Sequence, residues 1–557
     1  MTQTPPQAPN RDTSSSGVVR ILDGIEALGN KLPDPITLFF ILCLIVVGVS
    51  AIAGTANLSV VNPANQETVT AVSLLTPNGL RRIVSEALEN FVAFPPLGTT
   101  LVALLGVGVA EYTGLLGAAL RQLVQVAPVR LISPVVVFAG VMSNVAGDAG
   151  YVVLVPLGAV TFLAFRRHPL AGLAAAFSGV AGGFSANLLI SPTDALLSGL
   201  SQSAAQLIDP NYTVNATSNY YFMVVSTLVV TLVGWYITDK VVEPRLGTYS
   251  EINSASETTQ MNAETHREQV VEDFSEGDRH PANFNTTEPS VDPVEEGRSN
   301  TAPLSAVERK GLRWAGYSLL AFIALILALL LPPQGILRDP ETFTLIPSPF
   351  IEGIVFMVAI AFFIPGVVYG KVTGFVQSDK EVAQGMAQAM SSMGYYLALA
   401  FMAAQFVAYF NWSNLGIISA VSGAEFLRST GIAGPPLFVC FILLSVLLDL
   451  FIGSASAKWA IMAPIFVPMF MLVGYSPASV QAAYRIGDST TNIITPLMLY
   501  FPMVVAFGQR YDKNLGIGKL ISIMLPYSLS FLVAWSLLFV IWFVLGLPLG
   551  PGAGVQL

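Results

Sequence analysis

Long stretches with little or no charge are the feature that most constrains this chain. A run of about 18 or more apolar residues can cross the hydrocarbon core of a membrane as a helix. The first such run spans 36–54, and others of similar length lie at 97–119, 221–238, 315–331 and 350–370. Only 11% of the 557 residues are charged, against roughly 25% in soluble domains. The pattern excludes a soluble enzyme and predicts an all-α polytopic membrane protein.

The net charge of −9 comes from one segment. The window 251–300 holds twelve acidic and three basic residues, so the rest of the chain is balanced. This window is rich in Glu, Ser, Thr and Asn and poor in aromatic residues, a composition that cannot bury enough apolar surface to fold. We therefore expect a disordered acidic linker between two membrane halves, and no nucleic acid as a partner.

The positions of Lys and Arg predict the orientation. Arg20 and Lys31 precede the first apolar run, whereas the segments 55–80 and 332–349 are nearly free of basic residues. Because Lys and Arg collect in short cytoplasmic loops, we expect a multi-pass protein of the cell inner membrane with its N-terminus in the cytoplasm. The predicted division is a cytoplasmic segment at 1–35, a first transmembrane repeat at 36–238, an acidic cytoplasmic linker at 239–313, a second transmembrane repeat at 314–547 and a C-terminal tail at 548–557.

The two halves resemble each other at an offset of about 302–308 residues. The string at 148–151 is followed by Pro156, and the string at 456–459 is followed in the same way by Pro464. Breaks rich in Gly, Pro and small polar residues interrupt both halves, and such breaks must be buried or line a wet cavity. Paired, interrupted repeats are typical of secondary transporters. We therefore expect two inverted repeats with about nine transmembrane helices and two re-entrant hairpins, in which 187–194 and 488–496 are non-helical and face each other across a cavity.

Ionisable side chains at membrane depth are candidates for function, because each costs several kcal/mol unless it is paired or hydrated. The chain has six that stand out: Glu111, Asp148, Asp194, Asp449, Arg485 and Asp488.

Arg485 and Asp488 are three residues apart and so lie on one face of a helix. They could form an internal salt bridge that holds the hairpin. Alternatively, Arg485 could receive an anionic substrate group while Asp488 gains or loses a proton. Asp449 has no basic residue close to it in sequence, which makes it a candidate for a protonated carboxyl within the membrane.

Other polar and aromatic residues flank the breaks, and each of them could have either a structural or a functional role. Asp194 follows Pro192 and could cap a helix or lie in the site. Asn187 and Asn492 could pack helices together or coordinate sodium. Trp459 could belong to an interfacial belt or stack on a ring-bearing substrate. Tyr151, which precedes Trp459 by the repeat offset, lies beside the matching break and argues against the interfacial interpretation. For Glu111 and Asp148, nothing in the spacing decides between packing and a role in proton relay.

Four strings resemble those of the p-aminobenzoyl-glutamate transporter (AbgT) family. They are Gly147-Asp148-Ala149-Gly150-Tyr151, Ser191-Pro192-Thr193-Asp194, Gly453-Ser454-Ala455-Ser456-Ala457-Lys458-Trp459, and Tyr484-Arg485-Ile486-Gly487-Asp488-Ser489 followed by Asn492 and Pro496. The resemblance runs from about 20 to 545, and only the 251–300 insert departs from it by its length.

The resemblance implies a homodimeric carrier of p-aminobenzoyl-glutamate or p-aminobenzoate, with sulfonamide efflux in some members, driven by the proton motive force. At matching positions it implies that the site is lined by Asp194, Ser456, Trp459, Arg485, Asp488 and Pro496. Asp488, Asp194 and Asp449 are the candidates for proton coupling. No metal-ligand cluster or cofactor motif is present in the sequence.

Three rival functions stay open from the residues alone. A sodium-coupled dicarboxylate carrier would use Asn187 and Asn492 for the ion. A membrane-embedded enzyme would need a nucleophile with its base or a metal site, and the sequence shows neither. A channel would need no coupled carboxylate.

Overall fold

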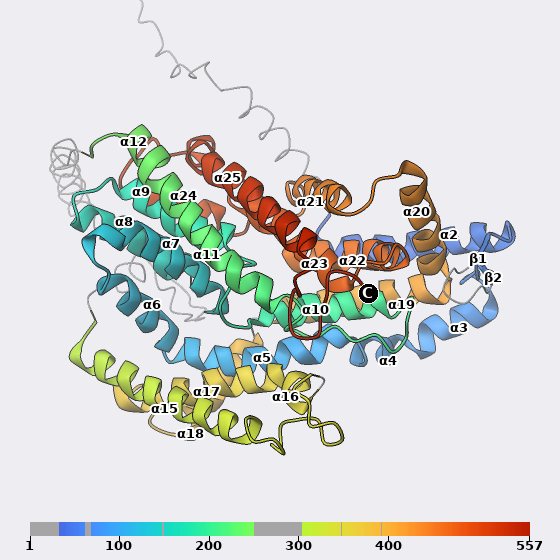
Figure 1. Cartoon of the computed structure of the whole chain (residues 1–557), viewed down its shortest axis with the longest axis horizontal. Coiled ribbons are helices and arrows are strands. Elements are labelled where there is room, and N and C mark those ends of the chain that lie inside the picture. The colour runs from blue at the N-terminus through green and yellow to red at the C-terminus, as the bar shows by residue number, and fades with distance from the viewer. Residues whose placement is uncertain (1–32, 62–67, 147–149, 250–303, 347, 392) are drawn as a thin grey trace, which may run out of the picture.

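The computed structural model is an elongated bundle of helices (Figure 1). It describes residues 33–557 except 62–67, 147–149, 250–303, 347 and 392. The expected disorder of 251–300 therefore lies outside the described residues, as do Asp148 and most of the segment 1–35. Within the described part, the one sheet is an antiparallel pair of short strands, β1 (Ser59–Val61) and β2 (Thr68–Thr70).

The helices of the first half are α2 (Pro35–Thr55), α3 (Pro77–Ser85), α4 (Ala87–Val92), α5 (Pro95–Tyr112), α6 (Leu115–Gln125), α7 (Ile132–Ser143), α8 (Val155–Ala164), α9 (Pro169–Phe177), α10 (Pro192–Ala205), α11 (Tyr220–Ile237) and α12 (Glu243–Leu246). Short 3₁₀ or π segments are η1 (Val129–Leu131), η2 (Asn144–Ala146), η3 (Gly150–Leu154), η4 (Ser178–Gly182) and η5 (Thr238–Val242).

The helices of the second half are α15 (Ala306–Leu330), α16 (Pro349–Glu352), α17 (Ile354–Thr373), α18 (Asp379–Ser391), α19 (Gly394–Trp412), α20 (Leu415–Thr430), α21 (Pro435–Asp449), α22 (Ala455–Leu472), α23 (Pro477–Asn492), α24 (Phe501–Gln509) and α25 (Ile517–Val544).

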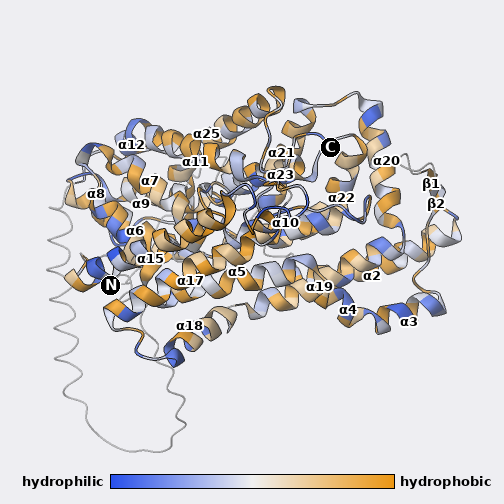
Figure 2. Cartoon of the chain, turned by 60° about the horizontal axis from the view of Figure 1, so that its bottom comes forward, coloured by the Kyte–Doolittle hydropathy of each residue, from blue (hydrophilic) through white to orange (hydrophobic). Residues whose placement is uncertain are grey.

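The prediction of an all-α polytopic membrane protein is confirmed. Within the described residues, 6 helices are long and apolar enough to cross a membrane: α2, α11 with its continuation to Leu246, α15, α17, α22 and α25. The bent pairs α5 with α6 (65°) and α18 with α19 (47°) raise the number to 8 if each pair is one span. Hydrophobic residues run along α2, α15, α17 and α25 (Figure 2).

The order of elements repeats between the halves. The α5/α6 junction turns at Gly114 with φ +79°, and the α19/α20 junction turns at Asn414 with φ +59°. Gly and Asn are the residues that adopt this left-handed conformation most readily. In each half two helices, a break, two helices, a second break and two more helices follow this turn. The inverted orientation of the halves and the predicted domain boundaries stay predictions.

The predicted positions of the breaks need correction. The non-helical stretches that precede α10 and follow α23 are 183–191 and 493–500, so the prediction was wrong for 192–194 and for 488–492, which are helical. Pro192 is compatible with the first turn of a helix, where its missing N–H is not needed. Pro496 disfavours a helical conformation at the residue before it. This effect does not reach Asn492, where α23 ends four residues before the proline.

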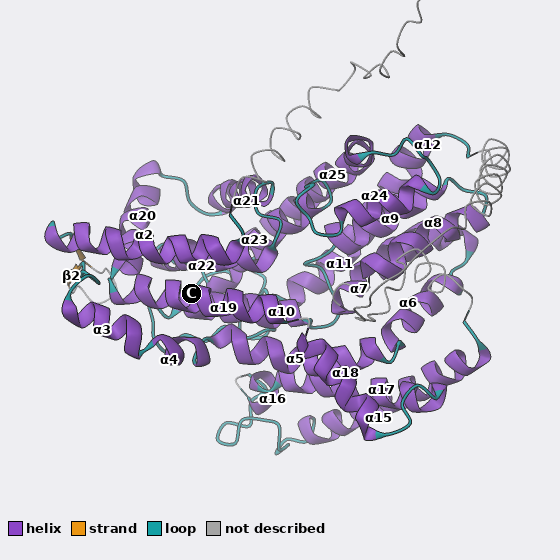
Figure 3. Cartoon of the chain, turned by 180° about the vertical axis from the view of Figure 1, so that it is seen from behind, coloured by secondary structure: helices purple, strands orange, loops and turns teal. Residues whose placement is uncertain are grey.

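Helix α23 is the most deeply buried element of the site region, with all its residues from Pro477 to Asn492 buried. It packs on α21, α22, α10 and α25, while α10 in turn packs on α22 and α5. From behind, α10, α19 and α22 are seen in the same region (Figure 3). Elements from both halves therefore meet around α23.

Candidate functional site

A cavity of about 1150 Å³ lies where the broken segments meet. Its wall includes Pro192 from the start of α10, Ser456 from the start of α22, and Asn492 from the end of α23. Asn144, Tyr151 and Tyr500 also line it. The rings of Tyr151 and Tyr500 stack with their centroids 4.5 Å apart. The cavity is thus bordered by both halves and offers amides, hydroxyls and aromatic rings.

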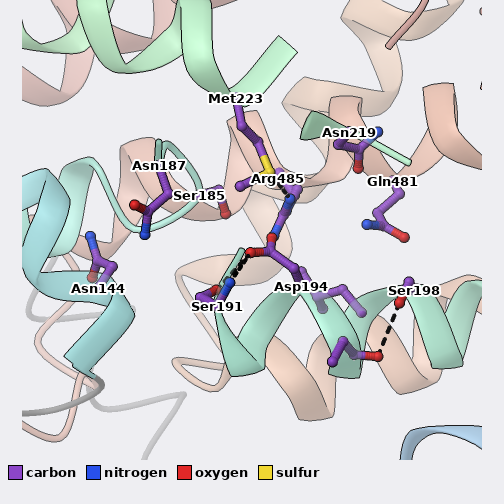
Figure 4. A network of polar contacts seen from close by, with 12 residues as sticks. Asn144, Ser185, Asn187, Ser191, Asp194, Ser198, Asn219, Met223, Gln481 and Arg485 are labelled. Atoms are coloured by element: carbon purple, nitrogen blue, oxygen red, sulfur yellow. Dashed lines mark hydrogen bonds and ion pairs between the residues drawn. The ribbon is translucent and has the colours of Figure 1, made fainter. Parts of the chain in front are cut away.

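Asp194 and Arg485 form a buried ion pair behind this wall. Asp194 Oδ2 accepts hydrogen bonds from the Ser191 N–H (2.7 Å) and hydroxyl (2.8 Å), and its Oδ1 pairs with Arg485 (Figure 4). The capping interpretation of Asp194 is therefore correct, and the same carboxylate joins α10 of the first half to α23 of the second.

The guanidinium of Arg485 keeps capacity for another acceptor. Its Nη1 lies 2.8 Å from Met223 Sδ, and its Nε has no hydrogen-bond partner among the described residues. Ser185 and Asn219 lie around it (Figure 4); the Ser185 hydroxyl and the Asn219 carbonyl oxygen are also buried without a partner in the described chain. An arginine with five donors in a fixed fork can bind a carboxylate through two of them.

Asp488 does not pair with Arg485. Its Oδ1 lies 2.7 Å from the ammonium of Lys458, which also binds Asp449. All three side chains are at most 1% exposed. The predicted Arg485–Asp488 bridge is thus wrong, because α10 and α22 bring a separate partner to each residue.

Asp449, which has no basic residue close to it in sequence, has Lys458 as a partner in space. The chain turns back in the break at 450–454, which brings the first turn of α22 against the end of α21. Lys458 was missed by the sequence analysis, although it is the only charged residue between Asp449 and Arg485. This isolation in an apolar stretch was the signal that could have identified it.

Trp459 lies behind the cavity wall and not on it. Its side chain is 0% exposed, its ring stacks on Tyr484 with centroids 4.4 Å apart, and its Nε1 donates to Ser201 Oγ at 3.0 Å and to the Leu197 carbonyl at 3.2 Å. The ring therefore ties α22 to α10 and α23. An interfacial position is excluded by this burial.

The remaining predicted residues lie in different surroundings. Ser456 is on the cavity wall, 3.3 Å from the Ser454 hydroxyl. Asn492 also lines the cavity and donates to Asp488 Oδ2 at 3.4 Å. Asn187 is buried and accepts from the Leu189 N–H. Pro496 is half-buried in the second break.

Glu111 lines the same cavity from α5. Tyr500 is a wall residue that the sequence analysis did not single out. Within the described ranges, no group of three His, Cys, Asp or Glu side chains could hold a metal ion. Chemically, the arrangement allows the buried cations Arg485 and Lys458 to exchange ionic partners beside a cavity lined in part by aromatic rings.

Comparison with known proteins gives one consistent result. The model of the AbgT putative transporter family matches residues 20–273 and 286–557. The chain is 39% identical over 539 residues to the p-aminobenzoyl-glutamate transport protein of Escherichia coli (strain K12), covering 97% of each.

Two solved structures share the fold. The crystal structure of the Alcanivorax borkumensis YdaH transporter, described as having an unusual topology, is 43% identical with a TM-score of 0.82, over 93% of this chain and 100% of that one. The structure of Neisseria gonorrhoeae MtrF, described as illuminating a class of antimetabolite efflux pumps, is 45% identical with a TM-score of 0.83, over 96% and 100%. This chain therefore belongs to the AbgT transporter family and is a multi-pass membrane transporter.

Proposed function

We propose that this protein is a secondary transporter of p-aminobenzoyl-glutamate, p-aminobenzoate or similar aromatic carboxylates, with sulfonamides as further substrates, driven by the proton motive force. The observation that carries the proposal is the buried Asp194–Arg485 pair, which joins one broken segment of each half beside the cavity. The substrate named for the Escherichia coli relative supports the same chemistry.

The chemical groups of p-aminobenzoyl-glutamate match the residues around the cavity. This compound carries an aromatic ring and two carboxylates. The stacked rings of Tyr151 and Tyr500 provide an aromatic surface on the wall, against which a substrate ring can pack. Arg485 supplies the cation, with its Nε still without a partner in the described structure. A carboxylate that enters from the cavity would bind this guanidinium.

Coupling follows from competition for Arg485. A substrate carboxylate that takes the guanidinium leaves Asp194 buried without its cation. A buried carboxylate without a cation favours its protonated form, so Asp194 would take up a proton as substrate binds. Proton uptake on substrate binding suits import by symport, in which proton and substrate move together. Export by antiport requires the opposite sign, namely proton release on substrate binding.

The structure changes which carboxylate is proposed for this step. Asp488 was the first candidate for coupling, but its cation is Lys458 and not Arg485. Asp194 therefore takes its place at the exchange site. The sodium alternative rests on Asn187 and Asn492, whose side chains are engaged with Leu189 and Asp488.

We further propose a homodimer in the inner membrane, with the N-terminus in the cytoplasm.

The driving ion can be tested in proteoliposomes that contain the purified protein and labelled p-aminobenzoyl-glutamate. A pH gradient imposed without sodium is expected to drive accumulation or efflux, whereas a sodium gradient at equal pH is expected to have no effect. Transport driven by sodium alone would contradict proton coupling. Absence of any substrate movement would contradict the proposed substrate.

A further inference from the structure

Asp449, Lys458 and Asp488 form a buried cluster where α21, α22 and α23 meet. The two carboxylates of this cluster differ in their hydrogen-bond donors. Asp488 has a donor on each oxygen: the Lys458 ammonium (2.7 Å) on Oδ1 and the Asn492 amide (3.4 Å) on Oδ2. Asp449 has Lys458 on Oδ1, while its Oδ2 is buried with no partner among the described residues. Asp488 is therefore arranged as an ion, and Asp449 is not.

The count of charges leads to the same conclusion. Two carboxylates and one ammonium carry a net charge of −1 if all three are ionised, in a place where each side chain is at most 1% exposed. Burying an uncompensated charge costs far more than burying a neutral hydroxyl. One proton on the cluster makes it neutral, and the oxygen without a donor is where that proton is favoured.

Among the residues that the structure describes, the neighbouring elements supply no second cation for the cluster. The charged or titratable groups that face Asp449 are Lys458 on α22 and Asp488 with Tyr484 on α23. Arg485, also on α23, is committed to Asp194. On α25, which also packs on α21, Lys519 lies at the first turn and pairs with Asp512 at 2.5 Å, and Tyr527 bonds to Thr238.

The cluster is separated from the cavity by residues of the cavity wall that contact it directly. Asn492 lines the cavity and donates to Asp488, and Tyr484 donates to the carbonyl of Ala455 (2.6 Å), which also lines the cavity. A shift of Asn492 would open Asp488, and then Lys458 and Asp449, to water in the cavity. The cluster thus has a short path for proton exchange.

We propose that Asp449 is a second proton-binding site, that it is protonated in the conformation described here, and that Lys458 is the positioning residue that keeps Asp488 ionised beside it. A role for this site in transport rests on the proposed function; its protonation does not. The site differs from the Asp194–Arg485 pair, which is neutral without a proton.

Infrared spectroscopy of the purified protein at neutral pH tests the protonation directly, because a protonated carboxyl gives a carbonyl band that a carboxylate lacks. The protein is expected to show a band from a buried protonated carboxyl, and Asp449→Asn is expected to lose it. The matched control Asp194→Asn, at the other buried pair, is expected to keep it. Lys458→Gln is expected to raise the band about twofold, because both carboxyls lose their shared cation.

A band that persists undiminished in Asp449→Asn, or that disappears in Asp194→Asn, would overturn the proposal. If Asp449→Asn does not yield a folded protein, Asp449→Glu replaces it and must shift the band to the position of a glutamic acid; an unshifted band would equally contradict the assignment. The measurement needs no substrate, so a carrier of some other compound would still give these results. Failure of the proposed function would appear only in the transport assay.

Discussion

Arg485→Ala is expected to weaken binding of p-aminobenzoyl-glutamate at least about 30-fold and to abolish transport. Removing one side of a buried, hydrogen-bonded charge pair costs about 2–5 kcal/mol in binding, and about 1.4 kcal/mol corresponds to a factor of ten. The guanidinium is the cation that the cavity's substrate would meet, since Lys458 is already held by two carboxylates. Binding can be measured by isothermal titration calorimetry on the purified protein.

The same substitution leaves Asp194 buried without its cation, so stability needs a control. The double variant Arg485→Ala with Asp194→Asn removes both charges and should recover thermal stability without recovering binding. Arg428→Ala, which removes an arginine at the exposed end of α20, should leave affinity unchanged. Affinity within threefold of the original value in the double variant would rule out Arg485 as the carboxylate-binding group.

Trp459→Ala is expected to destabilise the folded protein by about 3–5 kcal/mol, the usual cost of truncating a large buried ring. The indole is fully buried, stacks on Tyr484 and donates to Ser201 and Leu197 of α10. Its loss would leave a void between the two halves and loosen the support of α23. Thermal unfolding in detergent, compared at equal protein concentration, measures the effect.

Trp459→Phe provides the matched comparison, because it keeps a six-membered aromatic ring against Tyr484 and removes the five-membered ring of the indole with its N–H. A smaller loss of stability, about 1–2 kcal/mol, is expected from the lost hydrogen bonds and reduced packing. If both variants unfolded at the original temperature while losing substrate affinity, the ring would act on the substrate itself, and the structural role assigned to it here would be wrong.

The fold class could be predicted because bilayer physics leaves few choices. Long apolar runs must be helices, and interruptions at membrane depth must be shielded. The repeat was visible in sequence because the strings at 148–151 and 456–459 keep their distance from a following proline. The exact ends of the breaks were not predictable from proline and glycine alone, since Pro192 begins a helix and α23 continues to Asn492.

The ionic partners could not be predicted from spacing. Arg485 and Asp488 share a helix, yet Arg485 pairs with Asp194, 291 positions away, and Asp488 pairs with Lys458, 30 positions away. Only the packing of α10 and α22 against α23 decides this. For the same reason Trp459 looked accessible from its motif, although the fold places it behind the cavity wall.

The proposed linkage between substrate and proton depends on the Asp194–Arg485 pair. The most direct measurement is the number of protons taken up when p-aminobenzoyl-glutamate is added to the purified protein in weakly buffered solution. We expect uptake of about one proton per substrate bound. Asp194→Asn should bind substrate at least as well with no uptake, and Asp449→Asn should retain it. Substrate binding without proton uptake in the original protein, or undiminished uptake in Asp194→Asn, would contradict this account.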